Sequence, residues 1–596
     1  MPRPSVFRAA LAGLLAVGFA CSGAVVPVTA APAAHARPAE DQDALLVHID
    51  TIDPVLPRSG DVEITGTVTN TTDTTFTRVN LHAFSSQSPI LDSAALAGSA
   101  LLDPTQDVGP RVTVPGTFDT IDEIPPGETA MFSDTVPVDL FGIPADEEGV
   151  YWIGVHAFGD GAVPRDGVAD GRARTFIPAR PSGSDTQEAS VILSVRSRVW
   201  FDSEGRIAGT DRWQRRLAEG GSLDGVLDMA DSAGSAPYSW LVDPAVLLAL
   251  ARLAAGNPPR SLAPDTSVPG QEPTPTETPT DPASGTATPE TLTPTPPEPT
   301  KTPNEDEAAL AAAASAWLAR FTLLVGTTPV LTLPFGDLDV SAAVRNDRSR
   351  YDQAIARGAE VMAALALPSR PAVAPEGDVL SPEAIAAVAP ETVIMLGDNA
   401  FAVPPTSRSS VVRLLGHKVV VTSTGAEAGG PGPTAANDPL ALRQRLLSEA
   451  ALRLANDDPA PLVVTLPTVW RGEDAAAFFG GLEQSWLDLV PAGEVADGSA
   501  VGVPASSLAY TDEDRDAELD SGSFTAATRA TDAAALLEQV LTLQTTVEAS
   551  VREEVLVTLS EQHRLQPRLA LRAAGRVEES LRDEIGKITI EVPKAV

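Results

Sequence analysis

The stretch VLTLPFGDLD, from Val330 to Asp339, joins a short run of β-branched residues and leucines to a turn that carries two carboxylates. The same order, an apolar run followed by an acidic turn, recurs at SWLVDP (Ser239 to Pro244), PAVAPEGD (Pro371 to Asp378) and TVIMLGD (Thr392 to Asp398). Segments with helical spacing separate these runs, and alternation of buried strands with helices is typical of parallel βαβ units. The repeated unit therefore predicts an α/β barrel.

Seven segments along the chain fit the strand part of this unit. They are Val191–Val199, Tyr238–Val242, Val330–Leu333, a short strand near Ala372, Val393–Leu396, Val419–Thr422 and Leu462–Leu466. Because the commonest barrel has eight strands, we expect a distorted barrel of about seven, formed by residues 187–256 and 305–500. Residues 257–304 between these parts are mostly Pro, Thr, Glu and Ser, which predicts a disordered insertion, either glycosylated or a bare spacer.

Residues 43–180 show a different pattern, in which apolar and polar residues alternate. The alternation is clear in DVEITGTVTN, TRVNLHA and GVYWIGVHAFG, and turns rich in Pro, Gly, Asn and Asp separate these runs. Short alternating strands at this spacing predict an antiparallel β-sandwich. The stretch PRSGDVEITGTVTNTTD, followed by IPPGETAMF, resembles the immunoglobulin-like modules of bacterial surface proteins. We therefore expect an immunoglobulin-like β-sandwich ahead of the barrel.

The first 36 residues predict a secretory signal peptide. Arg3 and Arg8 form its basic region, Ala9 to Ala20 its apolar stretch, and Ala34-His35-Ala36 a cleavage motif of small residues. Cys21, the single cysteine of the chain, lies in this segment, so a processed chain would have no disulfide. Lipidation of Cys21 is the alternative.

Length and charge indicate the broad class of protein. A chain of 596 residues exceeds one ordinary hydrophobic core, so several domains are expected. The net charge of −38 disfavours nucleic acid and anionic lipid as partners. No stretch after the signal offers the roughly 20 uninterrupted apolar residues of a membrane span. We therefore expect a secreted protein of the cell envelope, with no transmembrane segment in the mature chain.

The C-terminal residues 501–596 predict a helical segment, most clearly from Ala533 to Gly586. Two apolar stripes with helical spacing are expected to pack on the barrel: Leu537, Leu541, Val547, Val551 and Val555 in the first, and Leu569, Val577, Leu581 and Ile585 in the second. The terminal KITIEV alternates like a strand, yet the chain ends at Val596 before a partner strand appears. This pattern suggests a further domain that is cut short.

The candidate functional residues follow the predicted strands. In parallel α/β folds, ligands bind at the carboxyl ends of the strands. The residues so placed are Asp243, Asp337, Asp339, Glu376, Asp378, Asp398, Trp470, Arg471 and Glu473. Paired carboxylates with an aromatic side chain are what glycoside hydrolysis uses, and Asp243, Asp337 and Asp378 are the candidates for catalysis. Alternatively, these acids cap the helices that follow them.

Metal, nucleophile and cofactor chemistry find little support in the sequence. Polysaccharide deacetylases share the seven-stranded architecture, and Phe201-Asp202-Ser203-Glu204-Gly205 superficially resembles their acidic motif. No two histidines have metal-ligand spacing, so a zinc hydrolase is disfavoured and no metal is expected. The sequence contains no G-x-S-x-G elbow, no P-loop and no G-x-G-x-x-G, and we expect no cofactor.

The order of several loose motifs resembles a family of uncharacterised secreted actinobacterial proteins, sometimes called glycoproteins, whose genes commonly neighbour that of the lipid II flippase. The matching segments are TGTVTNTTD, IPPGETAMF, RTFIPAR, YSWLVDPAVL, LTLPFGDLDVSAAV and LVVTLPTVW. The resemblance implies no established activity. The leading hypothesis is a non-catalytic protein that binds cell-wall glycan or another envelope partner. A carbohydrate-active hydrolase using strand-end carboxylates is the alternative, and a purely structural spacer is the third hypothesis.

Overall fold

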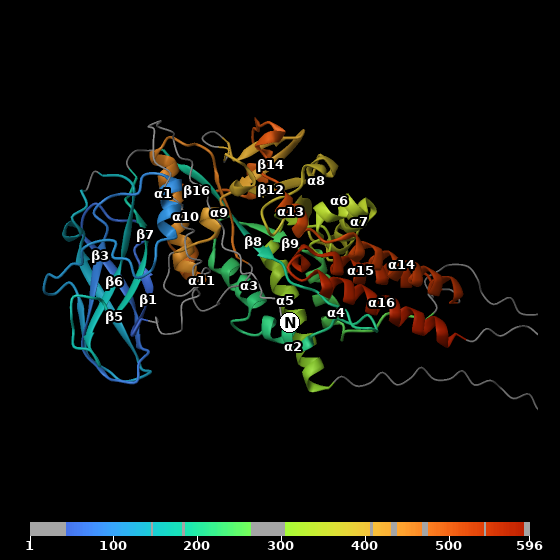
Figure 1. The fold of residues 1–596 in the computed structure, drawn as a ribbon, viewed down its shortest axis with the longest axis horizontal. Helices are drawn as coiled ribbons and strands as arrows, with labels where there is room; N and C mark the ends of the chain where they lie inside the picture. The colour runs from blue at the N-terminus through green and yellow to red at the C-terminus, as the bar shows by residue number, and fades with distance from the viewer. Residues whose placement is uncertain are drawn as a thin grey trace, which may run out of the picture. The chain divides into compact units, whose positions relative to one another are not determined.

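Seven parallel strands form the central sheet of the described chain (Figure 1). The computed structural model describes residues 43–144, 147–181, 185–263, 304–403, 405, 409–430, 438–467, 475–541 and 544–588. The predicted signal peptide with Cys21, most of the predicted insertion, Trp470, Arg471 and Glu473, and the end of the KITIEV segment lie outside these residues. The parallel strands are β8 (Gln187–Val195), β9 (Ser239–Val242), β10 (Val330–Thr332), β11 (Ser369–Val373), β12 (Val393–Gly397), β14 (His417–Thr422) and β15 (Leu462–Thr465).

The order of these strands follows a barrel. It runs β15-β8-β9-β10-β11-β12-β14, and every neighbouring pair is parallel. The two ends of this order, β14 and β15, are not paired as strands within the described residues. On the remaining seam the backbone N–H of Ser423, just after β14, donates to the carbonyl of Val463 in β15 at 2.8 Å. The short strands β13 (Val411–Leu414), β16 (Leu487–Leu489) and β17 (Val501–Gly502) extend the sheet.

Successive side chains along each strand point to opposite sides of the sheet, which produces two apolar layers. One set of side chains faces the barrel interior and forms a small core that includes Ile192, Leu331, Val393 and Val463. The residues between them face outward and join the surrounding helices in a larger core. Helix α12 (Ala492–Asp497) adds Ala492, Val495 and Ala496 to the interior core. Inward and outward residues alternate in this way in every closed or nearly closed barrel.

The first barrel strand lies four residues earlier in the chain than predicted, at Gln187–Val195. The apolar run from Val191 predicts a strand through Val199, whereas β8 ends at Val195. The Arg196 side chain is buried beside Asp337, and an Arg198 guanidinium nitrogen donates to the Gln562 carbonyl at 2.5 Å. The backbone therefore leaves the sheet where these two side chains make contacts that the apolar pattern does not reveal.

Helices lie between the parallel strands as the sequence predicts, except that β12 and β14 have no α-helix between them among the described residues, and α11 (Ala475–Phe479) follows the last parallel strand. The helices are α2 (Thr210–Leu217), α3 (Ser222–Ser232), α4 (Pro244–Ala254), α5 (Glu305–Val325), α6 (Val340–Asn346), α7 (Arg348–Ala364), α8 (Pro382–Ala387), α9 (Thr424–Glu427), α10 (Pro439–Ala455) and α11. Within the described ranges α5 alone is long and apolar enough to cross a membrane by length and composition. One stripe of α5, including Leu310, Trp317 and Phe321, is buried in the outer barrel core, as in the core helix of a barrel.

Residues 43–181 form two antiparallel sheets around a shared core. The first sheet has the order β1-β2-β5 and the second β4-β3-β6-β7. Their strands are β1 (Leu45–Ile52), β2 (Asp61–Asn70), β3 (Phe76–Ser85), β4 (Asp119–Ile124), β5 (Thr129–Pro137), β6 (Val150–Asp160) and β7 (Gly171–Pro178), with helix α1 (Ser93–Ala100) after β3. Val47 and Ile64 from one sheet and Val79 and Ile153 from the other share one apolar cluster. The predicted two-sheet arrangement is present, and its immunoglobulin-like assignment stays a prediction.

Helix α10 joins the two β structures. Its Arg443 donates to the carbonyl of Ile52 at 2.8 Å, and Gln444 donates to that of Phe176 at 2.9 Å. Leu440 belongs to the apolar core of the two antiparallel sheets. Helix α10 therefore covers one side of the barrel and also contacts the two antiparallel sheets of residues 43–181.

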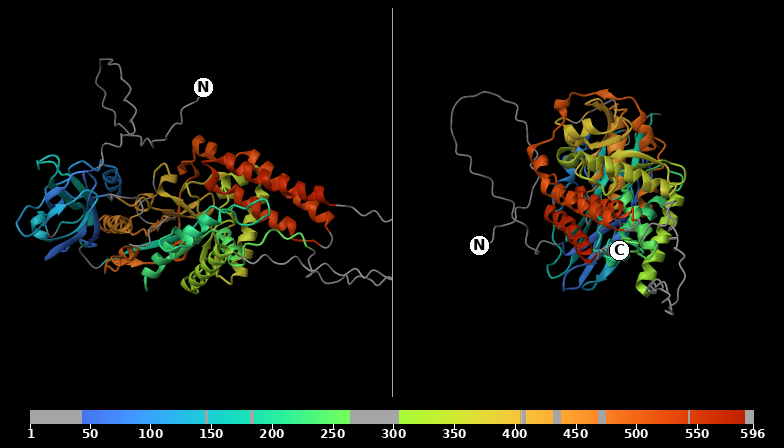
Figure 2. Two further views of the ribbon diagram at one scale, coloured as in Figure 1. Left: turned by 90° about the horizontal axis from the view of Figure 1, so that it is seen from below. Right: turned by 90° about the vertical axis from the view of Figure 1, so that its right-hand side faces the viewer.

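The C-terminal helices α14 (Ser521–Val540), α15 (Val547–Leu556) and α16 (Pro567–Lys587) lie together (Figure 2). The first predicted stripe is not one helix, because α14 ends at Val540 and α15 begins at Val547. Both stripes nevertheless pack on the barrel as predicted. Leu537, Val551 and Val555 from the first stripe, and Val577 and Leu581 from the second, belong to the outer barrel core.

Candidate functional site

A polar cavity of about 290 Å³ lies at the carboxyl ends of the parallel strands. We call it the mouth cavity. Ser194, Thr422 and Thr465 line it, each two residues beyond an interior apolar residue of the same strand. The interior therefore changes from aliphatic to hydroxyl side chains as the strands reach their ends. The Ser194 hydroxyl is buried and has no hydrogen-bond partner among the described residues.

Arg196 is the basic side chain of the mouth cavity. It follows the end of β8, and only 6% of its side chain is exposed. One guanidinium nitrogen donates to the carbonyl of Ala374 and lies 3.5 Å from Asp337 Oδ1. Its Nε–H has no partner among the described residues. The guanidinium is thus held by one side of the cavity and retains a free donor.

Asp378 lines the same cavity from the loop after β11. Its backbone has a φ of 64°, a left-handed conformation that Asp and Asn tolerate better than most residues. The Gly397 N–H donates to the Asp378 carbonyl at 3.0 Å. A Cβ at Gly397 would lie 2.7 Å from that of Asp378, so the glycine permits this loop to approach β12 closely. Burial raises the pKa of Asp378 to about 6, and nearby Glu561 and Asp398 add to the rise.

Glu427, which is absent from the acids predicted above, lines the same cavity as Asp378. It is the last residue of α9, and the Thr465 N–H donates to its Oε1 at 3.1 Å. Burial raises the pKa of Glu427 to about 8, and the like charge of Asp378 adds to the rise. Near neutral pH Glu427 is therefore protonated and Asp378 ionised, a pairing suited to general acid and base chemistry.

Two of the three predicted catalytic acids have structural roles. Asp243 is the N-cap of α4, and its Oδ1 accepts hydrogen bonds from Ala245 at 2.9 Å and Gly336 at 2.8 Å. Burial raises the pKa of Asp243 to about 8. Asp337 is 4% exposed and pairs with Arg196. Neither residue lines the mouth cavity.

The remaining predicted ligand-binding acids are divided between the cavity and its surroundings. Glu376 lines the mouth cavity and is exposed at its rim. Asp339 is fully buried, caps α6 through the Ala342 N–H and forms two hydrogen bonds with Arg564. Asp398 accepts hydrogen bonds from the backbone and hydroxyl of Thr424. Asp243 and Asp339 therefore cap the helices that follow them, as the alternative interpretation expects, whereas Glu376 and Asp378 line the cavity.

A turn of the C-terminal segment covers part of this end of the barrel. We call residues 557–564 the mouth turn. Its Glu561 accepts a hydrogen bond from the Glu376 N–H at 3.1 Å and donates its own N–H to the Asp337 carbonyl at 2.8 Å. Burial raises the pKa of Glu561 to about 7. The mouth turn therefore holds the loop after β10, which carries Asp337, and the loop after β11, which carries Glu376.

Sequence reasoning missed Arg196, Glu427 and Glu561 for different reasons. Arg196 was included in the strand, although a basic residue that interrupts an apolar run was a usable signal. Glu427 lies five residues beyond the end of β14, the same spacing as Asp378 after β11, but it belongs to a short helix and not to a turn. Glu561 comes from a helical segment far along the chain, and no local pattern indicates its contact with the barrel.

Within the described ranges, no group of three or more His, Asp or Glu side chains is arranged to hold a metal ion. The six histidines also lack the spacing of a metal-binding pair. The chemistry of the mouth cavity is accordingly derived from its carboxyl, hydroxyl and guanidinium groups.

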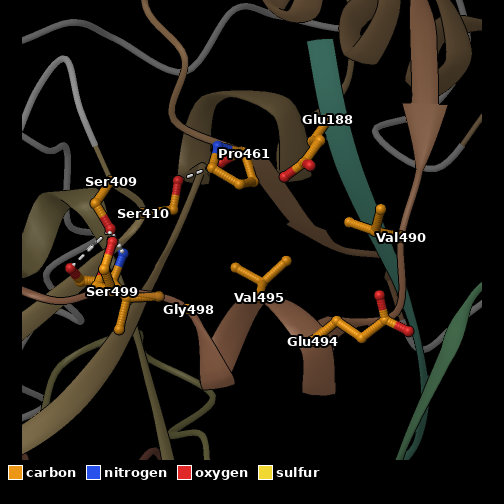
Figure 3. A pocket seen from close by; sticks show the side chains of 10 residues that line it. Glu188, Ser409, Ser410, Pro461, Val490, Glu494, Val495, Gly498 and Ser499 are labelled. Carbon is orange, nitrogen blue, oxygen red and sulfur yellow. Dashed lines mark hydrogen bonds between the residues drawn. The ribbon is translucent and has the colours of Figure 1, made fainter. Parts of the chain in front are cut away.

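A second cavity, of about 330 Å³, lies between β8, β13 and α12 (Figure 3). Its three serines lie on one side, with Glu188 and Glu494 on the other. The Ser409 hydroxyl donates to the Ser499 carbonyl at 2.7 Å, and the Ser410 hydroxyl donates to that of Pro461. These hydroxyl protons are already used within the protein. The mouth cavity, with its unpaired Ser194 and Arg196 groups, is the better candidate for ligand binding.

Comparison with known proteins adds little to this geometry. No protein-family model matches the sequence. No curated protein is detectably similar to it. Among solved structures, it is similar to a GH57-type branching enzyme from Pyrococcus horikoshii, with 12% identity and a TM-score of 0.38 over 67% of this chain and 88% of the other. The α-amylase AmyC from Thermotoga maritima is 11% identical, with a TM-score of 0.35, and the match covers 67% of this chain and 96% of the amylase chain. Scores this low transfer neither activity nor residue roles.

Proposed function

We propose that the mouth cavity is a carbohydrate-active site in which Glu427 and Asp378 form an acid and base pair. The observation that supports this proposal is that Glu427 and Asp378 line one cavity, where burial raises the pKa of Glu427 to about 8 and that of Asp378 to about 6. Two carboxyl groups held in different protonation states are the basic requirement of glycoside hydrolysis.

Each group then has a definite task. Glu427, protonated, donates its proton to the glycosidic oxygen as the bond to the leaving sugar breaks. Asp378, ionised, either activates a water molecule or attacks the anomeric carbon directly. The hydroxyls of Ser194, Thr422 and Thr465 and the free Nε–H of Arg196 offer hydrogen bonds to sugar hydroxyls.

The test is release of reducing ends from purified peptidoglycan and from a panel of soluble glucans. We expect Glu427→Gln and Asp378→Asn each to lower the rate by at least about a hundredfold, the usual loss when a general acid or base is removed. Glu63→Gln, an exposed change in β2, serves as the matched control. Full activity in both cavity variants, with unchanged thermal unfolding, contradicts the catalytic assignment.

A second candidate is non-catalytic binding of cell-wall glycan. It is supported by the structural roles of Asp243 and Asp339, which are used to cap helices and to hold neighbouring loops. Retention on purified peptidoglycan without any release of reducing ends, and loss of retention in Asp378→Asn, would support binding alone. No retention at any salt concentration would contradict it.

The cellular location is proposed on the sequence features alone. The signal peptide pattern and the resemblance to secreted actinobacterial envelope proteins support export. Expression of the full chain in an actinobacterial host, followed by fractionation, provides the test. Recovery in the cytoplasm at full length would contradict export, and a Cys21→Ser variant distinguishes lipidation from simple cleavage.

A further inference from the structure

The mouth cavity has an unequal charge balance. Glu376, Asp378 and Glu427 line it, and Arg196 is the one basic residue among its lining residues. The Arg196 guanidinium is already used in part, because it contacts Asp337 and donates to the Ala374 carbonyl. Even with Glu427 protonated, the two carboxyl groups of Glu376 and Asp378 share the cavity with one guanidinium that is already partly used.

The buried polar groups of the cavity indicate that it takes a ligand. The Ser194 hydroxyl is 2% exposed by residue, lines the cavity and has no partner among the described residues. The Arg196 Nε–H is likewise unpaired. Unpaired buried polar groups cost free energy, and a ligand with hydroxyl groups would satisfy both of them.

The two observations together define what the ligand must carry. Ionised carboxyl groups only accept hydrogen bonds, and an ammonium group supplies three donors and a positive charge. A neutral acetamido group in the same place supplies one donor and no charge. A carboxylate-bearing sugar would bring further negative charge to an acidic cavity and be repelled.

We propose that the mouth cavity selects a sugar that carries a free primary amine over the same sugar in its N-acetylated form. The ammonium group lies against Asp378 and Glu376, and the ring hydroxyls are bound by Ser194 and the Arg196 Nε–H. This inference rests on the proposed function, since it takes the cavity to be a sugar site. The cavity volume, near the lower end of the roughly 300–1,000 Å³ of ligand pockets, suits a single sugar ring.

The experiment compares glucosamine oligomers with N-acetylglucosamine oligomers of the same length by calorimetry, using the full chain near neutral pH. We expect the amine form to bind at least about tenfold more tightly, the effect of a hydrogen bond to a charged group. Equal binding of the two forms overturns the amine preference and leaves the carbohydrate proposal intact. Binding of neither form overturns the amine preference, and release of reducing ends from the glucan panel then decides the carbohydrate proposal separately.

Variants locate the selectivity in the cavity. Asp378→Asn keeps a side chain that tolerates the left-handed backbone at this position, so it should fold, and we expect it to abolish the preference for the amine. Glu376→Gln, exposed at the rim, should reduce the preference without affecting stability. The surface control Glu63→Gln should leave it unchanged. A preference that survives in both cavity variants overturns the inference.

Discussion

Asp378 and Glu427 illustrate how burial and mutual repulsion give two chemically similar residues different properties. Both carboxyl groups lie in the mouth cavity, and each has a pKa raised mainly by burial. The shift is larger for Glu427, which must also ionise next to Asp378. Between about pH 6 and pH 8 Glu427 is protonated and Asp378 is ionised, so the first can act as an acid and the second as a base.

This difference predicts a bell-shaped dependence of glycan cleavage on pH. The rate should rise as Asp378 ionises, near its pKa of about 6, and fall as Glu427 loses its proton, near its pKa of about 8. The measurement is initial rate against pH with the best substrate of the panel. A flat profile over this window would show that neither group carries the reaction.

At the scale of elements, strands were easier to predict than contacts between elements. Buried parallel strands are continuous apolar runs, and all seven were placed within a few residues of their observed bounds. Glu376 and Asp378 follow the end of β11 by three and five residues, within the PAVAPEGD turn that the sequence singles out. The positions of Glu427 and Glu561 depend on α9 and on the mouth turn, whose docking leaves no periodic signal in the sequence.

Arg564 is predicted to be the main anchor of the mouth turn. Its guanidinium bonds both oxygens of Asp339, at 2.7 and 2.8 Å, and lies 3.0 Å from Glu561. Arg564→Met would leave two buried carboxyl groups without their cation, and we expect a loss of about 3–5 kcal/mol in unfolding free energy. Urea unfolding measures the loss.

The matched control is Arg582→Met in α16, whose ion pair with Glu578 is exposed. The Arg582 side chain is 66% exposed, and such pairs contribute about 0–1 kcal/mol. If both variants lose the same stability, Arg564 is not an anchor of the mouth turn.

His48 makes the contact between β1 and α10 sensitive to pH. Its Nδ1 lies 2.7 Å from Asp50 and its Nε2 3.4 Å from Asp438, the N-cap of α10. The hydrogen bond to Asp438 raises the pKa of His48 to about 9 from its usual 6.5. Protonated His48 stabilises the folded state. This stabilisation is fully present at a pH below 6.5, the pKa of the unfolded chain, and it is lost as the pH rises through about 9, the pKa in the folded state.

We therefore expect the melting temperature to fall between about pH 6.5 and pH 9 more steeply in the wild type than in His48→Gln. Differential scanning calorimetry across this range measures the difference. Asp438→Asn should reproduce the flatter profile, although it also alters the cap of α10. Parallel profiles for wild type and His48→Gln would contradict this role.

At the scale of the whole molecule, the C-terminal helices complete the barrel core. Val551, Val555 and Leu581 are buried in the same cluster as strand residues such as Leu193 and Ile394. The sequence predicted the apolar stripes and their packing on the barrel. It could not predict that the segment also reaches the mouth, because contacts between residues separated by more than 200 positions leave no local pattern.

A chain that ends at residue 543 should therefore fail to form a cooperative fold. It would lose the mouth turn and expose the apolar residues that α15 and α16 cover. We expect dye binding typical of exposed apolar surface and loss of near-ultraviolet dichroism. A chain ending at Ile588 is the control and should retain both native properties. A sharp, unchanged melting transition in the shorter chain would contradict the dependence.

The mouth turn has a consequence for the kinetics of folding. Asp337 and Asp339 obtain their partners only when residues 557–564 have docked. During synthesis, the ribosome must therefore release more than 200 further residues before the loop after β10 can reach its final conformation. Loop closure over such a separation slows folding, and it leaves the barrel strands exposed to misassembly in the meantime.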